Sequence, residues 1–482
     1  MDYAPTRNES GDQGSISGPP MGCQHMNEVE ALNTFQEEKM NKRFNRRSFL
    51  QLSAMTAGGG LLAACVAPAP AMDDAGAGMD EEPVEIRLAE GSWGGPEGIA
   101  FWTDEIIPAF EEEQPGINVT FENAESPDYA DKLYTQSVAG DAPDVMFIWG
   151  GINYNLMQKG QLLQLDDYFD SEDLEDFYPA KLDAHLLDGK LYGMPKYVST
   201  AAVAYNKDLL DEAGVDYPDG TWTWVDYLAA YEAATVPDDD GNIVSWGNYM
   251  NYRILEHYVW MNGGEWMNAP LFGTKCLLDS AEALEALQFN YDQIFGSNPV
   301  SPIAGTIPEV GWHNIFSTGK VAFAESHSWT VTNYIRENDF NWDFTDLPLS
   351  PTGGKAGITF ADGYGVAKLT KEPDAAVELV RFLTGPKAQR AMALGIVGLQ
   401  PTRRSVAGEA WDVESMGAQA GFDVAAFSRI MDDARLDPAF QENEKVNSEI
   451  FSPIWEQIWV TNELGLEEGV NLIVQRIDEL FA

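Results

Sequence analysis

The chain has 482 residues, of which 44% are hydrophobic and 11% aromatic, and this composition excludes a chain that is disordered throughout. Its 77 acidic and 29 basic residues give a formal net charge of −48, which excludes a general affinity for nucleic acid or anionic lipid. The same charge disfavours strongly anionic cargo, although a local pocket can differ from the mean.

An export signal is predicted near the N-terminus. A basic start leads into an uncharged run over residues 49–64 that ends at Cys65 and is too short to span a bilayer. The sequence around Arg46 and Arg47 resembles a twin-arginine signal. Residues 62–65 resemble the lipobox of bacterial lipoproteins, which implies acylation of Cys65. The alternative is a signal peptide cleaved near Ala64, with an incidental cysteine.

Residues 1–64 are therefore assigned to an N-terminal extension and export signal, with Met1 and Met40 as alternative starts. Residues 65–83 are rich in alanine, proline, glycine and acidic residues, and little in them can pack into a core. We predict that they form a flexible lipoprotein tether.

From Val84 onward, short apolar strands alternate with amphipathic helices. Residues 84–89, 118–122 and 145–149 are predicted strands, and residues 102–114 and 129–139 are predicted helices. This βαβαβ pattern predicts an α/β domain. Further elements are predicted in this order: a strand at 201–206 and helices at 207–213, 223–234, 280–294, 373–384 and 466–481.

Several stretches of the body, in a fixed order, resemble one known family. They are IPAF at 107–110, PGINV at 115–119, GDAPDV at 140–145, FIW at 147–149, LYGMP at 191–195, AYNKDLL at 204–210, WTW at 222–224, FSTGKVAF at 316–323 and SW at 328–329. Because these stretches occur together and in this order, residues 84–482 resemble the extracellular solute-binding proteins of ABC sugar importers, which are related to maltose-binding protein.

The resemblance implies a type II periplasmic-binding-protein-like α/β fold, with two lobes, a hinge and a ligand cleft between the lobes. Lobe 1 would comprise residues 84–199 and 360–408, and lobe 2 residues 200–359 and 409–482. It further implies a monomer that is not an enzyme and that delivers a small polar ligand, a carbohydrate, to the permease subunits of an ABC importer. With the predicted signal, the protein would be anchored through Cys65 to the outer face of the cytoplasmic membrane.

Tryptophans that follow predicted strands are the first candidate ligand contacts. Sugars present flat apolar faces and a rim of hydroxyl groups, so their sites combine aromatic rings with polar side chains. Trp93, Trp149 and Trp329 all follow strands, where the ligand sites of α/β domains collect. By the resemblance, Trp149 and Trp329 stack on the ligand. The remaining contacts implied in this region are Ser92, Trp93, Glu125 and Asn153.

A second group of candidates lies later in the chain. Lobe 2 would present Tyr249, Tyr252, Trp260 and Trp266 to the cleft, with packing in the core as the alternative. At the expected second hinge crossing lie Asp362, Gly363 and Tyr364, where Gly363 would give the backbone freedom and Tyr364 would reach the ligand. A plain turn is the alternative there. Arg403 is a further candidate, with a surface ion pair as the alternative.

No cofactor and no metal site are predicted. The three cysteines form no Cys-x-x-Cys pair, and none of the five histidines shows His-x-x-x-His spacing. The acidic residues 237–242 lack the spacing of an EF-hand loop, so a tight turn is predicted rather than a calcium site.

Two questions stay open at this stage. A secreted glycoside hydrolase with paired carboxylates is the rival from another functional class, although neither a barrel-like eightfold repeat nor a Gly-x-Ser-x-Gly elbow is visible. Within the binding hypothesis, the ligand could be an oligosaccharide, a monosaccharide, a polyol, a sugar phosphate or a non-sugar such as a peptide. Residues 150–153 carry no charged side chain, unlike the corresponding loop of the family, which disfavours a large maltodextrin.

Overall fold

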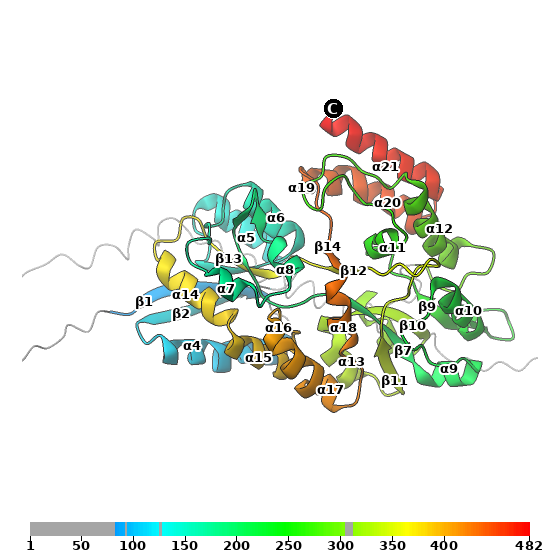
Figure 1. The fold of residues 1–482 in the computed structure, drawn as a ribbon, viewed down its shortest axis with the longest axis horizontal. Helices are drawn as coiled ribbons and strands as arrows, with labels where there is room; N and C mark the ends of the chain where they lie inside the picture. The colour runs from blue at the N-terminus through cyan, green and yellow to red at the C-terminus, as the bar shows by residue number, and fades with distance from the viewer. Residues whose placement is uncertain (1–81, 92–93, 125–127, 304–311) are drawn as a thin grey trace, which may run out of the picture. The chain divides into compact units, whose positions relative to one another are not determined.

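The computed structural model describes residues 82–91, 94–124, 128–303 and 312–482, all within the unit Met79–Ala482 (Figure 1). The predictions for Arg46, Arg47, Cys65 and the tether fall outside these residues, as do those for Ser92, Trp93 and Glu125. Within the described ranges, every helix is too short or too polar to cross a membrane.

The first sheet has the strand order β2-β1-β3-β13-β6. Its strands are β1 (Val84–Gly91), β2 (Ile117–Ala124), β3 (Val145–Ile148), β6 (Met194–Pro195) and β13 (Gly363–Val366). β1 runs parallel to β2 and β3, whereas β13 runs antiparallel to β3 and β6. All four residues of β3 are buried, as expected for an inner strand that is covered on both faces.

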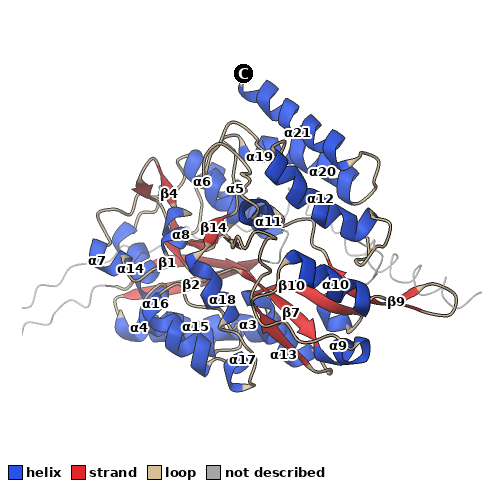
Figure 2. Cartoon of the chain, turned by 45° about the vertical axis from the view of Figure 1, so that its right-hand side comes forward, coloured by secondary structure: helices blue, strands red, loops and turns tan. Residues whose placement is uncertain are grey.

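Helices surround this sheet in both views (Figures 1 and 2). The longest is α5 (Asp128–Ala139), and α14 (Pro373–Leu383) buries Val377, Val380 and Leu383 in the same core. The others are α3 (Gly95–Ala100), α4 (Ile107–Glu113), α6 (Gly150–Gln158), α7 (Ser171–Leu174), α8 (Pro179–Asp183), α15 (Pro386–Leu394) and the π-helix η1 (Phe101–Ile106). A small hairpin is formed by β4 (Leu186–Leu187) and β5 (Lys190–Leu191).

The second sheet has the strand order β11-β7-β10-β9-β8. Its strands are β7 (Ala201–Asn206), β8 (Val236–Pro237), β9 (Ile243–Tyr249), β10 (Val321–His327) and β11 (Trp342–Thr345). β7 is antiparallel to β10 and β11, and β9 is parallel to β10. The turn between β8 and β9 is tight, because the Asp238 carboxylate accepts hydrogen bonds from the amides of Asp240 and Asn242.

Local sequence signals define several helices near the second sheet. Asn206 caps α9 (Lys207–Ala213) by accepting from two backbone amides, and Gly214 ends it in a left-handed conformation. Thr223 and Asp226 form a capping box for α10 (Trp224–Ala234). The other helices are α11 (Glu256–Met261), α12 (Ala281–Phe295), α13 (Val331–Glu337), α16 (Arg404–Val406), α17 (Met416–Gln419), α18 (Ala426–Arg429), α19 (Asn443–Lys445), α20 (Ser452–Trp459) and α21 (Leu466–Phe481).

The chain passes between the two sheets at a region that we call the junction: residues 196–200, 359–362 and 434–437. It includes the end of β12 (Gly357–Thr359) and β14 (Ala434–Leu436), which pair in parallel. Thr200 and Thr359 form a bridge, and the amide of Asp437 donates to the Thr359 carbonyl at 3.0 Å. The backbone of all three segments is therefore hydrogen-bonded together.

Candidate functional site

Trp149 stands at the carboxyl end of β3, where it is the N-cap residue of α6. Its ring stacks on Tyr129 with centroids 5.3 Å apart and lies 5.2 Å from the ring of Phe147. The side chain is partly exposed. The buried Tyr129 therefore fixes the plane of the Trp149 ring, which stays partly exposed at the carboxyl end of β3.

Trp329 occupies the corresponding place on the second sheet, directly after β10. Its ring is stacked on His327 with a centroid separation of 4.2 Å and an interplanar angle of 6°, and its edge meets Phe360. Burial lowers the pKa of His327 to about 3, so the imidazole is neutral at physiological pH. The partly exposed Trp329 thus rests on an uncharged, flat support.

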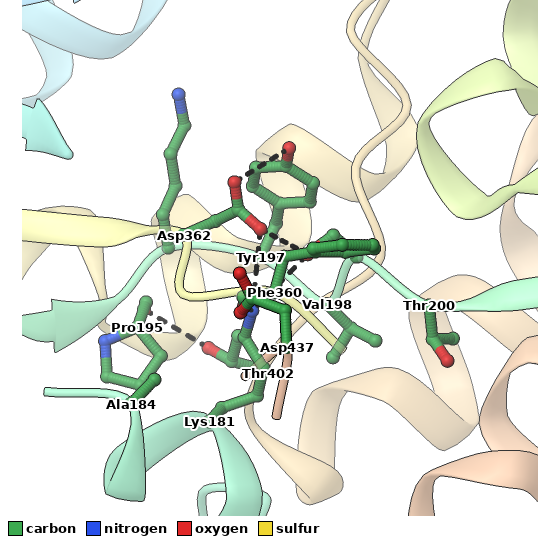
Figure 3. Close-up of polar contacts among 12 residues, drawn as sticks. Lys181, Ala184, Pro195, Tyr197, Val198, Thr200, Phe360, Asp362, Thr402 and Asp437 are labelled. Carbon is green, nitrogen blue, oxygen red and sulfur yellow. Dashed lines mark hydrogen bonds and ion pairs between the residues drawn. The ribbon is translucent and has the colours of Figure 1, made fainter. Parts of the chain in front are cut away.

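A buried network of charges connects the junction segments (Figure 3). Tyr197 donates to Asp362 at 3.2 Å, and the Ser199 hydroxyl donates to the other carboxylate oxygen. Lys181 rises from α8 to donate to the Phe360 carbonyl, and its ammonium lies 3.6 Å from Asp362. Burial lowers the pKa of Lys181, which the charge of Asp362 opposes.

Asp437 brings the third junction segment to the same place. It accepts a hydrogen bond from Tyr154 of α6 at 3.1 Å. Although Asp437 keeps some exposed surface, desolvation raises its pKa to about 7. The Tyr154 hydrogen bond and Lys181 lower this pKa, and the negative charge of Asp362 raises it. The junction thus holds a carboxyl group whose ionisation changes near neutral pH.

A second buried ion pair lies inside the first sheet. The ammonium of Lys196 is 2.8 Å from each carboxylate oxygen of Glu90, and the Tyr364 hydroxyl donates to one of them at 2.7 Å. Lys196 also lies 4.0 Å from the centroid of Phe147. Burial lowers the pKa of Lys196, opposed by the charge of Glu90. The pair satisfies its own charges without any ligand.

With this geometry in view, the comparisons with known proteins decide the family. The model of the bacterial extracellular solute-binding proteins matches residues 95–390. The chain belongs to this family. Two relatives are an ABC transporter extracellular-binding protein of Pyrococcus horikoshii (27% identity over 314 residues, 63% of this chain and 69% of the relative) and a galactooligosaccharide-binding protein of Bacillus subtilis (25% over 363 residues, 72% and 82%).

Solved structures agree with the fold of a solute-binding protein. An ABC substrate-binding protein of Listeria monocytogenes in complex with cycloalternan has a TM-score of 0.71 at 24% identity, covering 83% of this chain and 99% of that one. A cyclic α-maltosyl-1,6-maltose binding protein of Arthrobacter globiformis has a TM-score of 0.68 at 22% identity, with coverage of 83% and 99%. The predicted type II, two-lobed α/β fold is confirmed.

Some of the predicted site residues are enclosed in this solute-binding protein. Tyr364 is fully buried with its hydroxyl on Glu90, which leaves it no surface for a ligand and corrects the expectation that it reaches one. Gly363 is required for close packing rather than for freedom, because a Cβ atom there would lie 2.6 Å from the Met194 carbonyl oxygen and would also clash with His185.

Asn153 is fully buried as well and lies among protein groups. Its amide donates to the Ala184 carbonyl at 2.7 Å, and its oxygen lies 3.3 Å from the His185 ring nitrogen. Burial lowers the pKa of His185 to about 3, so this contact is made by a neutral imidazole. The Asn153 side chain ties α6 to the segment that follows α8.

The four aromatic candidates predicted for lobe 2 keep only between 5% and 9% of their surface exposed: Tyr249, Tyr252, Trp260 and Trp266. Trp266 packs against Phe451 and Trp455 in the core of the C-terminal helices. Trp260 lies under the guanidinium of Arg435, which pairs with Glu265 at 2.6 Å. Trp260 and Trp266 also line a hollow with Glu265 and Arg435, and contact of these two rings with a ligand stays a prediction.

Arg403 forms an ion pair, but not at the surface. Its side chain is 6% exposed and its guanidinium lies 2.9 Å from Asp173 and 3.4 Å from Asp176. It also donates to the Thr384 carbonyl at 2.7 Å. The residue connects α7 and α14 to the start of α16, and the expected surface location is corrected.

Sequence reasoning missed the buried cations and some polar residues of the junction: Lys181, Lys196, Tyr197 and Ser199. The position of the last three in the sequence could have indicated them, because Lys196 follows the LYGMP stretch and Ser199 is the last residue before the expected hinge crossing. Lys181 gave no signal, because a lysine in a short polar helix usually faces solvent. Among the described residues, no group of three or more His, Cys, Asp or Glu side chains is placed to hold a metal ion.

Proposed function

We propose that the protein is the substrate-binding component of an ABC importer that captures a carbohydrate between its lobes and delivers it to a membrane permease. The observation that carries the proposal is the pair of partly exposed tryptophans, Trp149 and Trp329. Each follows the carboxyl end of an inner strand, one in each sheet, and the junction connects the two sheets.

The chemistry of these groups suits a sugar. An indole face held by Tyr129 or His327 is rigid and apolar, so it can cover the C–H face of a pyranose ring without loss of side-chain freedom. The names of relatives give independent support, because they include galactooligosaccharide-, arabinooligosaccharide- and maltodextrin-binding proteins. The proposal includes the lobe boundaries given above and contacts from Ser92, Trp93 and Glu125.

The proposal includes that the sugar is bound and released without being cleaved. A glycoside hydrolase needs two carboxyl groups that flank the sugar and can exchange protons with it. Two buried carboxylates near the aromatic rings, Glu90 and Asp362, are instead engaged by lysines and hydroxyl groups of the protein. The same contacts serve well to hold the junction in shape.

The cellular setting of the proposal comes from the N-terminal sequence. Export through the twin-arginine route by Arg46 and Arg47, acylation at Cys65 and a tether over residues 65–83 would hold a monomer at the outer face of the cytoplasmic membrane. Metabolic labelling with a radioactive fatty acid tests this part. Label is expected in the exported protein and absent from Cys65→Ser.

The ligand is tested by thermal shift and calorimetry with mono-, di- and oligosaccharides, polyols and amino acids. A saturable shift with a carbohydrate is expected, lost in Trp149→Ala and Trp329→Ala. Trp222→Ala is the matched control, because Trp222 is also partly exposed but packs on Tyr227. Chromatography of the recovered ligand is expected to show it unchanged. Cleaved products would instead support a hydrolase, and a response to amino acids alone would exclude a sugar ligand.

A further inference from the structure

Arg253 differs from every other arginine in the described part of the chain. Each of the others has a guanidinium nitrogen within 3.9 Å of a carboxylate oxygen: Arg87, Arg336, Arg381, Arg390, Arg403, Arg404, Arg429, Arg435 and Arg476. Arg253 is exposed and forms no such ion pair with any described residue, although acidic side chains greatly outnumber basic ones. Its positive charge is therefore not balanced by a carboxylate of the described residues.

The topology of the second sheet places Arg253 at the edge that carries Trp329. β9 and β10 are parallel neighbours in which Tyr249 pairs with Ala324. The chain leaves β9 toward Arg253 and leaves β10 toward Trp329, so both residues follow carboxyl ends at one edge of the sheet. The junction enters at this edge too, because Ala201 of β7 pairs with His327 of β10.

The side chain of Arg253 has a built support. Its guanidinium lies over the ring of Tyr252 at 4.4 Å from the centroid. Burial raises the pKa of Tyr249, and the charge of Arg253 opposes this rise. The Asn251 oxygen accepts the backbone amide of Arg253 at 3.3 Å. These contacts orient the planar cation without neutralising its charge.

A second observation concerns Asn251, two residues before Arg253 in the chain. The amide nitrogen of Asn251 is buried and has no hydrogen-bond partner among the described residues, which is costly unless a group arrives to accept from it. Asn251 lines a small hollow together with Tyr249, Met250 and Glu325, and Tyr249 is also a neighbour of Arg253. Glu325, which lines the same hollow, lies 3.0 Å from His257. Burial and the charge of Glu456 raise the pKa of Tyr252, the tyrosine under Arg253.

We propose that Arg253 binds a carboxylate on the ligand, and hence that the ligand is an acidic oligosaccharide containing a uronic acid. This inference rests on the proposed function. A guanidinium matches a carboxylate in two parallel hydrogen bonds, and a single guanidinium balances one negative charge. A phosphate dianion would leave a charge uncompensated in a protein whose net charge is already strongly negative.

Matched pairs of sugars test the inference. The probes are digalacturonate and its dimethyl ester, and glucuronic-acid disaccharides and their neutral glucose counterparts, measured by calorimetry at low ionic strength. At least one acidic member is expected to bind ten-fold or more tightly than its neutral partner, with a preference that falls as NaCl is added. Arg253→Gln should remove the preference and leave the affinity for the neutral partner within about two-fold, whereas Arg253→Lys should keep part of it.

Arg404→Gln is the matched control, since Arg404 also lies over a tyrosine, at 4.9 Å from the Tyr178 centroid, but is paired with Asp432. This variant should leave the acidic preference unchanged. Neutral and acidic sugars that bind equally, or an unchanged preference in Arg253→Gln, would overturn the inference while leaving the carbohydrate function in place. Failure of every sugar to bind would overturn both.

Discussion

The two buried lysines of this protein are held in different ways. Lys196 is the first residue of the junction, but its ammonium lies 2.8 Å from both oxygens of Glu90 in β1, and one of these oxygens also accepts from the Tyr364 hydroxyl of β13. Lys181 instead donates to a backbone carbonyl of the junction and lies farther, at 3.6 Å, from Asp362. One lysine completes a fully satisfied ion pair with the first sheet. The other shares a looser network with the backbone that connects the two sheets, so the two buried charges differ in how tightly the protein holds them.

The largest effect is expected where the pair is tightest. Glu90→Gln removes the charge that compensates Lys196 in an apolar surrounding and should lower the free energy of unfolding by about 3–5 kcal/mol. Urea unfolding followed by tryptophan fluorescence measures it. The double variant Glu90→Gln/Lys196→Met should recover most of the loss, because no uncompensated charge then remains. A loss below about 1 kcal/mol in the single variant would contradict the view of Glu90–Lys196 as a rigid pair.

The stability contributed by Asp437 of the junction should depend on pH. Desolvation raises the pKa of Asp437 from 3.8 to about 7 in the folded state, so the folded protein binds the proton more tightly than the unfolded chain. The stability from this proton is complete below pH 4 and is lost as the pH rises toward and through 7. Relative to Asp437→Asn, the wild type should lose about 2–3 kcal/mol of unfolding free energy between pH 5 and pH 8.

Parallel urea titrations of the two proteins at both pH values give this difference directly. A constant gap between wild type and Asp437→Asn from pH 5 to pH 8 would show that Asp437 titrates in the folded state as it does in water.

The smallest effects on the free energy of unfolding are expected for Tyr364 and Tyr197, which donate to Glu90 and Asp362 respectively. Tyr364→Phe leaves a buried Glu90 oxygen without its 2.7 Å donor and should cost about 1.5–3 kcal/mol, since bonds to charged groups are the stronger ones. Tyr197→Phe removes a longer bond, 3.2 Å, from a partly exposed side chain and should cost about 1 kcal/mol. Thermal or urea unfolding compares them. Equal costs would mean that the two carboxylates are held alike.

The regular elements could be predicted because their signals are local. The helix at 207–213 has an asparagine cap before it and a glycine after it, and the observed α9 has the same bounds. The predicted helix at 102–114 divides into a π-helix and α4 at Ile107, beside Pro108, whose missing amide donor disturbs regular pairing. β12 and β14 are too short to carry any periodicity and were not predicted.

The junction was less accessible to sequence reasoning because its partners are distant. Trp149 and Trp329 could be proposed from their position after strands, and Asp362 from its place at the expected crossing. The burial of Lys196 is decided by Glu90, 106 residues away, and that of Lys181 by the Phe360 carbonyl, 179 residues away. A lysine taken alone carries no mark of either partner, so only the fold reveals the pairs.

The hydrogen bonds among the junction segments have a mechanical consequence. Ser199 accepts the amide of Phe360, Asp362 accepts that of Lys196, and Thr359 accepts that of Asp437, so no segment can shift along its neighbours without breaking backbone bonds. Sliding one segment past another therefore costs free energy, whereas bending all three together keeps these bonds and costs less. We therefore expect the three segments to bend together, so that one distance between spectroscopic labels on the two sheets reports the movement of all three.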